Sequence, residues 1–302
     1  MGKQCALPRV VTQDGHHHAD GNEDTIMDLG RTGIWTHSAR LSGGFAAEVE
    51  RLGYGTIWIG GSPGGDLALV DELLAATERL VVATGIVNIW TDDATTIAAD
   101  YRRIDGTFPG RFLLGVGVGH PEAAAQYTSP YAALVAYLDV LDAEGVPADR
   151  RMLAALGPRV LRLSATRTAG AHPYLVTPAH TALARTLLGP DALLAPEHKV
   201  VLRTDPDQAR AIGRPAVRKP YLSLINYTNN LRRLGYSDAD LADGGSDRLI
   251  DDLVAHGDPT TIAARIQEHI DAGADHVALQ VLTEPGENLL EPISRLAASV
   301  TA

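Results

Sequence analysis

Short apolar runs alternate with amphipathic helical stretches along the chain from Arg31 onward. The run Thr56-Ile-Trp-Ile59 is typical of a buried strand, whereas Phe45, Val49 and Leu52 recur at helical spacing after Ser42, which we expect to cap that helix. Eight strands are predicted, each separated from the next by a helix, at 33–36, 56–59, 81–87, 112–118, 152–156, 173–176, 199–202 and 276–282. An α/β chain with this count predicts a (β/α)₈ TIM barrel; a doubly wound sheet would suit about six strands better.

Two stretches lie outside this alternation. Residues 1–26 have no periodicity and include three adjacent histidines, so we expect a solvated leader or tag-like tail rather than a metal site, followed by a single barrel domain over 27–302. Residues 226–257 are too long for a simple connection and predict an insertion near the seventh strand. Such an insertion is a lid or binding loop, or else a helical excursion that contributes to a dimer surface.

The fourth predicted strand ends in three glycines spaced two residues apart, Gly115, Gly117 and Gly119, followed by His120. Glycines remove side chains from the end of the strand, so a flat ring system has room to lie against the backbone. An ordinary tight turn would also use this pattern. The spacing does not fit the dinucleotide-binding fingerprint, and the chain has no phosphate-binding GxxxxGK[ST] motif.

Composition and charge narrow the class of protein. The formal net charge of −11 argues against sequence-independent nucleic-acid binding. Cys5 is the only cysteine, so no internal disulfide can form. No apolar run is long enough for a membrane span, and the first residues lack the apolar segment of a signal peptide, so we expect a cytoplasmic protein without a membrane association.

A barrel active site lies at the carboxyl ends of the strands, and glycine recurs there while acidic residues are scarce. Neither a lysine nor a carboxylate pair is expected at this mouth, so aldolase and metal chemistry are not predicted, and a planar cofactor that brings its own chemistry is favoured. His37 and His120 are the candidate proton carriers. Gly157-Pro158-Arg159 at a strand-to-helix junction is a candidate phosphate seat, although Arg159 also suits a solvated helix start.

Four segments together resemble the luciferase-like monooxygenase superfamily, and more narrowly its deazaflavin-dependent (coenzyme F420) oxidoreductases of actinobacteria. They are Gly53-Tyr-Gly-Thr-Ile-Trp-Ile59, Phe108-Pro-Gly-Arg-Phe-Leu-Leu-Gly-Val-Gly-Val-Gly119, Gly157-Pro-Arg-Val-Leu161, and Gly257-Asp-Pro-Thr-Thr-Ile262 with Asp271-Ala-Gly-Ala-Asp-His-Val-Ala-Leu-Gln280. The resemblance implies a luciferase-like barrel that transfers a hydride to or from the deazaflavin C5. Some relatives instead bind FMN and activate oxygen.

The resemblance also implies a set of site residues. A cis peptide bond is expected near Gly85-Ile86, behind the cofactor ring. The other implied cofactor-binding residues are Asn88, Val118 and Gly119 beside the cofactor and Leu156, Gly157, Arg159 and Val160 around its phosphate; Gly60, Gly61 and Thr177, at further strand ends, complete the candidate set.

Departures from the family pattern are informative. In the sugar-phosphate dehydrogenase branch an Asp-His pair ends the second strand, where this chain has Gly60 and Gly61, and acids stand at the positions of His37 and His120. A sugar-phosphate substrate is therefore not expected, and proton donation is assigned to histidine. Three hypotheses follow: an F420-dependent oxidoreductase of a small molecule, an FMN-dependent monooxygenase, and a cofactor-binding protein without turnover. Superfamily members are commonly homodimers, which we also expect here.

Overall fold

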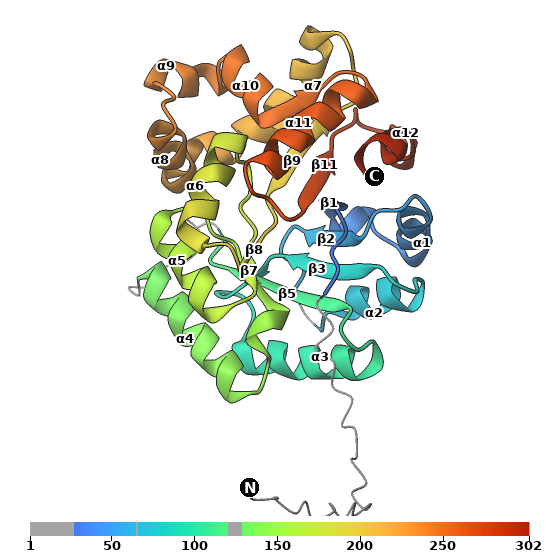
Figure 1. Ribbon diagram of the computed structural model, residues 1–302, viewed down its shortest axis with the longest axis vertical. Coiled ribbons are helices and arrows are strands. Elements are labelled where there is room, and N and C mark those ends of the chain that lie inside the picture. Colours follow the sequence, from blue (N-terminus) through green and yellow to red (C-terminus); the bar gives the residue numbers. More distant parts are fainter. Residues whose placement is uncertain (1–26, 65, 120–128, 302) are drawn as a thin grey trace, which may run out of the picture.

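The computed structural model describes residues 27–64, 66–119 and 129–301. Strands and helices alternate along the chain (Figure 1). The strands are β1 (Thr32–His37), β2 (Thr56–Gly60), β3 (Val81–Gly85), β4 (Val87–Asn88), β5 (Phe112–Gly117), β6 (Arg151–Leu153), β7 (Gly170–Ala171), β8 (Leu193–Leu194), β9 (Glu197–Val201), β10 (Val254–His256) and β11 (Val277–Val281). The α-helices are α1 (Gly43–Arg51), α2 (Ala68–Ala75), α3 (Ala94–Thr107), α4 (Pro130–Ala143), α5 (Pro158–Arg167), α6 (Pro178–Leu188), α7 (Pro206–Arg218), α8 (Ile225–Arg233), α9 (Asp238–Leu241), α10 (Asp247–Leu253), α11 (Pro259–Asp271) and α12 (Leu290–Val300). Short 3₁₀ turns are η1 (Ser38–Arg40), η3 (Ala148–Arg150), η4 (Tyr221–Ser223) and η5 (Ala242–Gly244).

The strands form one parallel sheet in the order β10-β9-β11-β1-β2-β3-β5-β6-β7-β8, and β4 pairs with β5. The seventh strand of the barrel consists of β8 and β9, interrupted at residues 195–196. It closes the sheet, because β8 pairs with β7 on one side and β9 pairs with β11 on the other. Backbone hydrogen bonds from Glu197 to Pro173 (2.8 Å) and from Ala278 to Pro196 (2.9 Å) continue both pairings. The predicted α/β class and (β/α)₈ barrel are confirmed.

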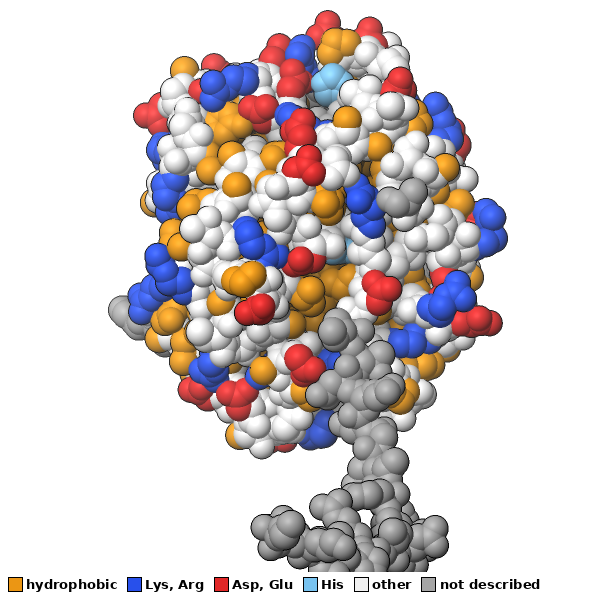
Figure 2. Space-filling view, viewed as in Figure 1, with side chains coloured by type: hydrophobic (Ala, Val, Ile, Leu, Met, Phe, Trp, Pro, Cys, Tyr) orange, Lys and Arg blue, Asp and Glu red, His pale blue; other side chains and the backbone are white. Residues whose placement is uncertain are grey.

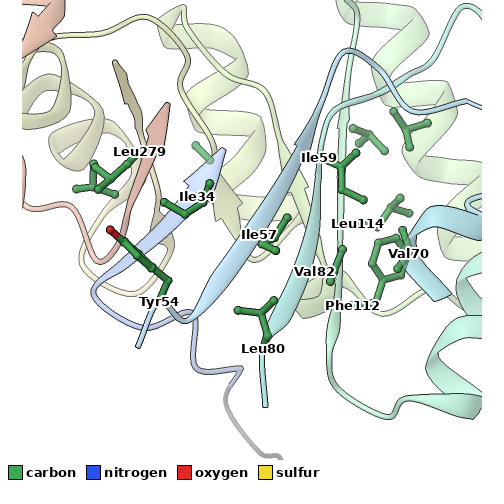
Figure 3. Packing of buried hydrophobic residues seen from close by; sticks show 14 of the residues in the cluster. Ile34, Tyr54, Ile57, Ile59, Val70, Leu80, Val82, Phe112, Leu114 and Leu279 are labelled. Carbon is green, nitrogen blue, oxygen red and sulfur yellow. The ribbon is translucent and has the colours of Figure 1, made fainter. Parts of the chain in front are cut away.

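Alternation along the strands separates two cores. Residues such as Ile34, Ile57 and Leu279 point out of the barrel and pack with the helices (Figure 3), whereas the next residues, such as Trp35 and Trp58, fill its interior. A strand directs successive side chains to opposite faces, so a strand that is apolar throughout serves both cores. Full burial of a large apolar side chain contributes about 1.5–3 kcal/mol, which makes both cores necessary for stability.

Most helix starts follow the predicted capping residues. The side chains of Ser42, Asp93 and Asp258 accept backbone N–H groups in the first turns of α1, α3 and α11. At the start of α2 the cap residue is Leu67, with φ at 51°, and Asp66 accepts the N–H of the first helical residue at 3.0 Å. The turn before α2 therefore has a left-handed residue at its cap instead of the usual extended one, and the helix still forms.

The sixth strand was predicted at 173–176, which is wrong; the strand is β7, three residues earlier. Pro173 has no N–H to donate to a sheet, and Leu175 has a left-handed backbone with φ at 56° that no strand accommodates. The N–H of Leu175 instead donates to the Glu197 carboxylate at 2.9 Å. The third predicted strand is also divided, because β3 ends at Gly85 and β4 starts at Val87.

The predicted insertion lies between the seventh and eighth barrel strands and contains α8, α9, η5, α10 and β10 (upper left and top of Figure 1). The strand β10 is not one of the eight barrel strands; it pairs with β9 at the edge of the sheet. On the face in Figure 2, basic and acidic side chains are interspersed over the surface. No helix within the described residues has the length and apolar character needed to cross a membrane.

Candidate active site at the carboxyl ends of the strands

A cavity of about 450 Å³ opens where the barrel strands end. Its walls come from the ends of β1, β3, β5, β6 and β7, from the segment after β2, and from the insertion. The lining residues are Trp35, His37, Gly61, Ser62, Gly85, Ile86, Asn88, Val118, Gly119, Ala154, Ala155, Leu156, His172, Tyr174, Pro220, Tyr221, Asn226 and Tyr227. This is the position and size typical of a small-molecule site in a barrel enzyme.

The cavity brings together many of the residues expected from the sequence. Those in its lining are His37, Gly61, Gly85, Ile86, Asn88, Val118, Gly119 and Leu156. Those outside its lining are Gly60, Gly157, Arg159, Val160 and Thr177. His120 lies outside the described residues, as do the three adjacent histidines of the N-terminal segment.

The glycines at the strand ends make room for neighbouring side chains. A Cβ atom on Gly60 would lie 2.2 Å from the Trp35 indole, and one on Gly85 would lie 2.7 Å from Trp35 Nε1. A Cβ atom on Gly117 would lie 2.8 Å from the Ala154 side chain. Gly60 and Gly117 thus serve the packing of the cavity floor, whereas Gly85 also lines the cavity.

A cis peptide bond joins Gly85 and Ile86, at the position that the family resemblance implies. Asn88 follows it in β4, and its side-chain oxygen accepts the N–H of Trp90 at 3.1 Å. The backbone of Gly119 lies against this amide, since a Cβ atom there would lie 2.7 Å from Asn88 Nδ2. The two strand ends therefore form one wall of small residues.

His37 is the last residue of β1, and its imidazole lies at the rim, with its ring centre 5.3 Å from that of Trp35. Partial burial, followed by the nearby charges of Arg40 and Lys199, lowers the pKa of His37 below its ordinary value. The side chain is therefore neutral at neutral pH and available to accept or return a proton.

The sequence prediction missed His172, which lies in the cavity wall just after β7. Its Nδ1 is 2.6 Å from the carbonyl oxygen of Ala195, so Nδ1 carries the proton and donates it, and Nε2 is left as an acceptor. The ring stacks on Trp58 at 4.0 Å, and burial lowers the pKa of His172 to about 4. Neither His172 Nε2 nor Trp35 Nε1 has a hydrogen-bond partner within the described part of the chain. Placing the sixth strand too late in the sequence concealed this residue.

Lys199 and Glu197 form an ion pair inside the barrel that was also not anticipated. Both side chains are fully buried, and Lys199 Nζ lies 3.0 Å from Glu197 Oε1. The ammonium group also lies 4.0 Å from the ring centre of Tyr174, which lines the cavity. Neither member of the pair is among the lining residues, so the cavity has no lysine or carboxylate among its described walls, as expected.

Four aromatic residues form a continuous surface that we call the aromatic wall: Trp35, Tyr174, Tyr221 and Tyr227. Neighbouring ring centres are 5.2 Å apart for Trp35 and Tyr174, 5.2 Å for Tyr174 and Tyr221, and 4.9 Å for Tyr221 and Tyr227. Such spacings are those of favourable aromatic pairs. Tyr227 comes from α8 of the insertion and Tyr221 from η4 directly before it, so the start of the insertion borders the cavity.

The start of α5 lies directly after the lining residue Leu156. Gly157 is its cap residue and makes no side-chain cap, and Pro158 occupies the first turn. The Arg159 guanidinium lies 3.7 Å from the ring centre of Tyr131 and is exposed. The positive end of the helix and a guanidinium group suit an anion. The described residues contain no group of three or more side chains arranged to hold a metal ion.

The fold is that of a (β/α)₈ barrel with a cavity at the carboxyl ends of its strands. The model of the family described as luciferase-like monooxygenase matches residues 26–143, so the resemblance predicted from the sequence is confirmed over this part of the chain. A search of curated protein sequences finds no significant match.

Several solved structures share the fold. An F420-dependent secondary alcohol dehydrogenase in complex with an F420-acetone adduct is similar with a TM-score of 0.69 and 13% identity, over 90% of this chain and 98% of that one. The coenzyme F420 dependent tetrahydromethanopterin reductase from Methanopyrus kandleri gives 0.65 and 14%, over 90% and 98%. The oxygenating constituent of 3,6-diketocamphane monooxygenase from the CAM plasmid of Pseudomonas putida, in complex with FMN, gives 0.67 and 12%, over 90% and 98%. At sequence identities this low, the structural similarity shows a common fold and nothing more.

Proposed function

We propose that this protein is an oxidoreductase that transfers a hydride between C5 of the deazaflavin coenzyme F420 and a small organic substrate. The observation that supports this most directly is the wall of small residues that line the cavity at the ends of β2, β3, β4 and β5. A flat tricyclic ring needs a surface with few projecting side chains, and this wall offers one. Similar barrels bind F420 or FMN in two of the solved structures, which makes a cofactor of this kind plausible.

The residues present fit such a cofactor. The ring would lie among lining residues of the small-residue wall, which are Gly61, Gly85, Ile86, Asn88, Val118 and Gly119. The phosphate would lie at the start of α5 and near the cap of α6, where the residues are Leu156, Gly157, Arg159, Val160 and Thr177. Arg159 makes no ion pair among the described residues, so its charge is available to a phosphate.

When bound, the deazaflavin supplies the hydride chemistry. The protein would exchange the accompanying proton through His37, which is neutral at neutral pH and lies at the rim of the cavity. His120 remains the second candidate proton carrier of the proposal. Trp35 and the tyrosines of the aromatic wall exclude water from one side of the cavity, which favours hydride transfer over side reactions.

Titration of the purified protein with coenzyme F420, followed by the fluorescence of the deazaflavin, tests this function. Binding at micromolar concentrations is expected, and Arg159→Met should weaken it about 10-fold, because a hydrogen bond to a charged group contributes about 1.5–3 kcal/mol. Arg162→Met is the matched control, since Arg162 is also exposed on α5. A deazaflavin without the phosphate should bind both variants and the wild type equally. No binding of F420 at micromolar concentrations would contradict the proposal.

The second candidate function is an FMN-dependent monooxygenase, which the similarity to the FMN complex of the diketocamphane enzyme favours. It predicts a flavin absorption spectrum on purification and oxygen consumption with reduced FMN. The same titration with FMN separates the two functions, because the proposed enzyme binds F420 more tightly than FMN.

We propose further that the protein acts as a homodimer in the cytoplasm, as superfamily members commonly do. Sedimentation velocity of the purified protein tests whether it is a homodimer. A mass of one chain at micromolar concentration would contradict the dimer.

A further inference from the structure

The cavity has no ionised side chain in its described lining. None of the lining residues is Asp, Glu, Lys or Arg. Burial holds the pKa of His172 near 4 and lowers that of His37, so both imidazoles are neutral at neutral pH. Burial also raises the pKa of Tyr221 to about 12 and that of Tyr174 further, so these hydroxyl groups keep their protons. A charged ligand would lose its hydration here without gaining a counter-ion.

The buried cation beside the aromatic wall is already paired. The Lys199 ammonium group lies 4.0 Å from the ring centre of Tyr174 and 3.0 Å from the Glu197 carboxylate. The pair has no net charge, and neither residue lines the cavity. An anionic substrate would therefore meet a tyrosine ring rather than the lysine.

Tyr174 is held firmly in the aromatic wall. Its hydroxyl donates to Gln280 Oε1 at 2.8 Å, and the Lys199 ammonium group lies 4.0 Å from its ring centre. Because the hydroxyl has a partner inside the protein, the residue presents its ring to the cavity. Tyr221 extends the same surface from η4, and Tyr227 extends it from α8 of the insertion. A rigid set of rings favours a planar partner, since an aromatic pair gains about 0.5–1.5 kcal/mol beyond its buried area.

Two polar atoms beside Gly85 have no hydrogen-bond partner among the residues that the structure describes. Trp35 Nε1 is a donor, and His172 Nε2 is an acceptor because its other ring nitrogen donates to Ala195. Both nitrogens lie beside Gly85, at 2.7 Å and 3.5 Å from the position that a Cβ atom would take there. A neutral polar group, such as a hydroxyl or a carbonyl, matches them better than an ion does.

We propose that the substrate is an uncharged molecule with a planar aromatic or conjugated ring, which binds against the aromatic wall and carries a hydroxyl or carbonyl group. This inference rests on the proposed function, since it assigns the small-residue wall to the cofactor and the aromatic wall to the substrate. Carboxylates, sulfonates and phosphate esters are disfavoured at the same position because the described lining provides no cation.

Calorimetric titration with three probes of similar size tests the substrate class, on protein first saturated with coenzyme F420 at pH 7.5. The probes are 2-naphthol, 2-naphthoate and decahydro-2-naphthol. The expected result is that 2-naphthol binds at least 10-fold more tightly than 2-naphthoate and about 2- to 10-fold more tightly than the saturated alcohol. Equal or tighter binding of the carboxylate, or no binding of any probe at millimolar concentration, would overturn the proposal.

Variants then test the wall itself. Tyr227→Leu should raise the dissociation constant of 2-naphthol about 2- to 10-fold and leave that of F420 unchanged. Tyr236→Leu is the control, because Tyr236 belongs to the insertion but does not line the cavity. Tyr221→Leu replaces the first variant if that variant does not fold. Weaker F420 binding in the wall variant, with 2-naphthol unaffected, would assign the wall to the cofactor and refute the inference. Failure of F420 to bind the wild type would instead refute the proposed function.

Discussion

Acidification should destabilise this protein well before ordinary carboxylates titrate. Burial lowers the pKa of His172 and His276 to about 4 and that of His198 to about 3, whereas all three have the ordinary value of 6.5 in the unfolded chain. Between these values the unfolded chain binds more protons than the folded protein does, so stability falls as the pH falls through this window. Above pH 6.5 the contribution of the neutral rings is fully present.

The magnitude is large enough to unfold the protein. At pH 5 each buried histidine lowers the free energy of unfolding by about 2 kcal/mol relative to pH 8, and the three together by about 6 kcal/mol. Globular proteins have free energies of unfolding of about 5–15 kcal/mol, so a loss of this size brings the midpoint of acid unfolding near pH 5. Urea unfolding at pH 7.5 and pH 5.0, followed by circular dichroism, measures the difference.

A variant separates the histidines from other acid-sensitive groups. His276 Nε2 accepts from the Trp58 indole at 3.0 Å, and its Nδ1 donates to the carbonyl of Gly30 at 2.8 Å. The amide of His276→Gln offers one acceptor and one donor but does not titrate, so this variant should lose about 2 kcal/mol less between the two pH values. Free energies of unfolding that agree within about 1 kcal/mol at pH 7.5 and 5.0 in the wild type would refute the reasoning.

Three further outcomes are expected. Lys199→Met should lower the free energy of unfolding by about 3–5 kcal/mol in urea, because it leaves a buried carboxylate unpaired; a loss below about 1 kcal/mol would contradict this. Gly60→Ala should cost about 1–3 kcal/mol, since its Cβ atom would overlap the Trp35 indole, whereas Gly106→Ala has open space in α3 and should stabilise by about 0.5–1 kcal/mol. His37→Gln should remove the acidic limb, below pH 6.5, from the pH profile of F420-dependent turnover while F420 still binds; an unchanged profile would exclude His37 as proton carrier.

The barrel could be predicted because its signals are local. Periods of two and 3.6 residues identify strands and helices, and capping residues such as Ser42 and Asp93 mark where helices start. Since the carboxyl ends of parallel strands lie at one face, residues that end different strands, such as His37 and Asn88, were expected together and do line one cavity.

What the sequence does not provide is contact between distant segments. The position of His172 depends on where the sixth strand ends, and a proline and a left-handed leucine shift that end. Lys199 begins the predicted strand 199–202 and lies within β9. The sequence does not indicate that its side chain points into the barrel, because both faces of such a strand are covered. Tyr227 reaches the cavity only through the path of the insertion, which no periodicity specifies.

Two parts of the cavity wall come from separate regions of the sequence. Residues 220–227 supply Pro220, Tyr221, Asn226 and Tyr227 as one continuous segment, while the small-residue wall comes from strand ends before residue 157. Exchange of that one segment therefore offers a way to change the shape of one side of the cavity while the small-residue wall stays as it is. Diversity within such a scaffold can accumulate in a short stretch of chain, and a designer can randomise it alone.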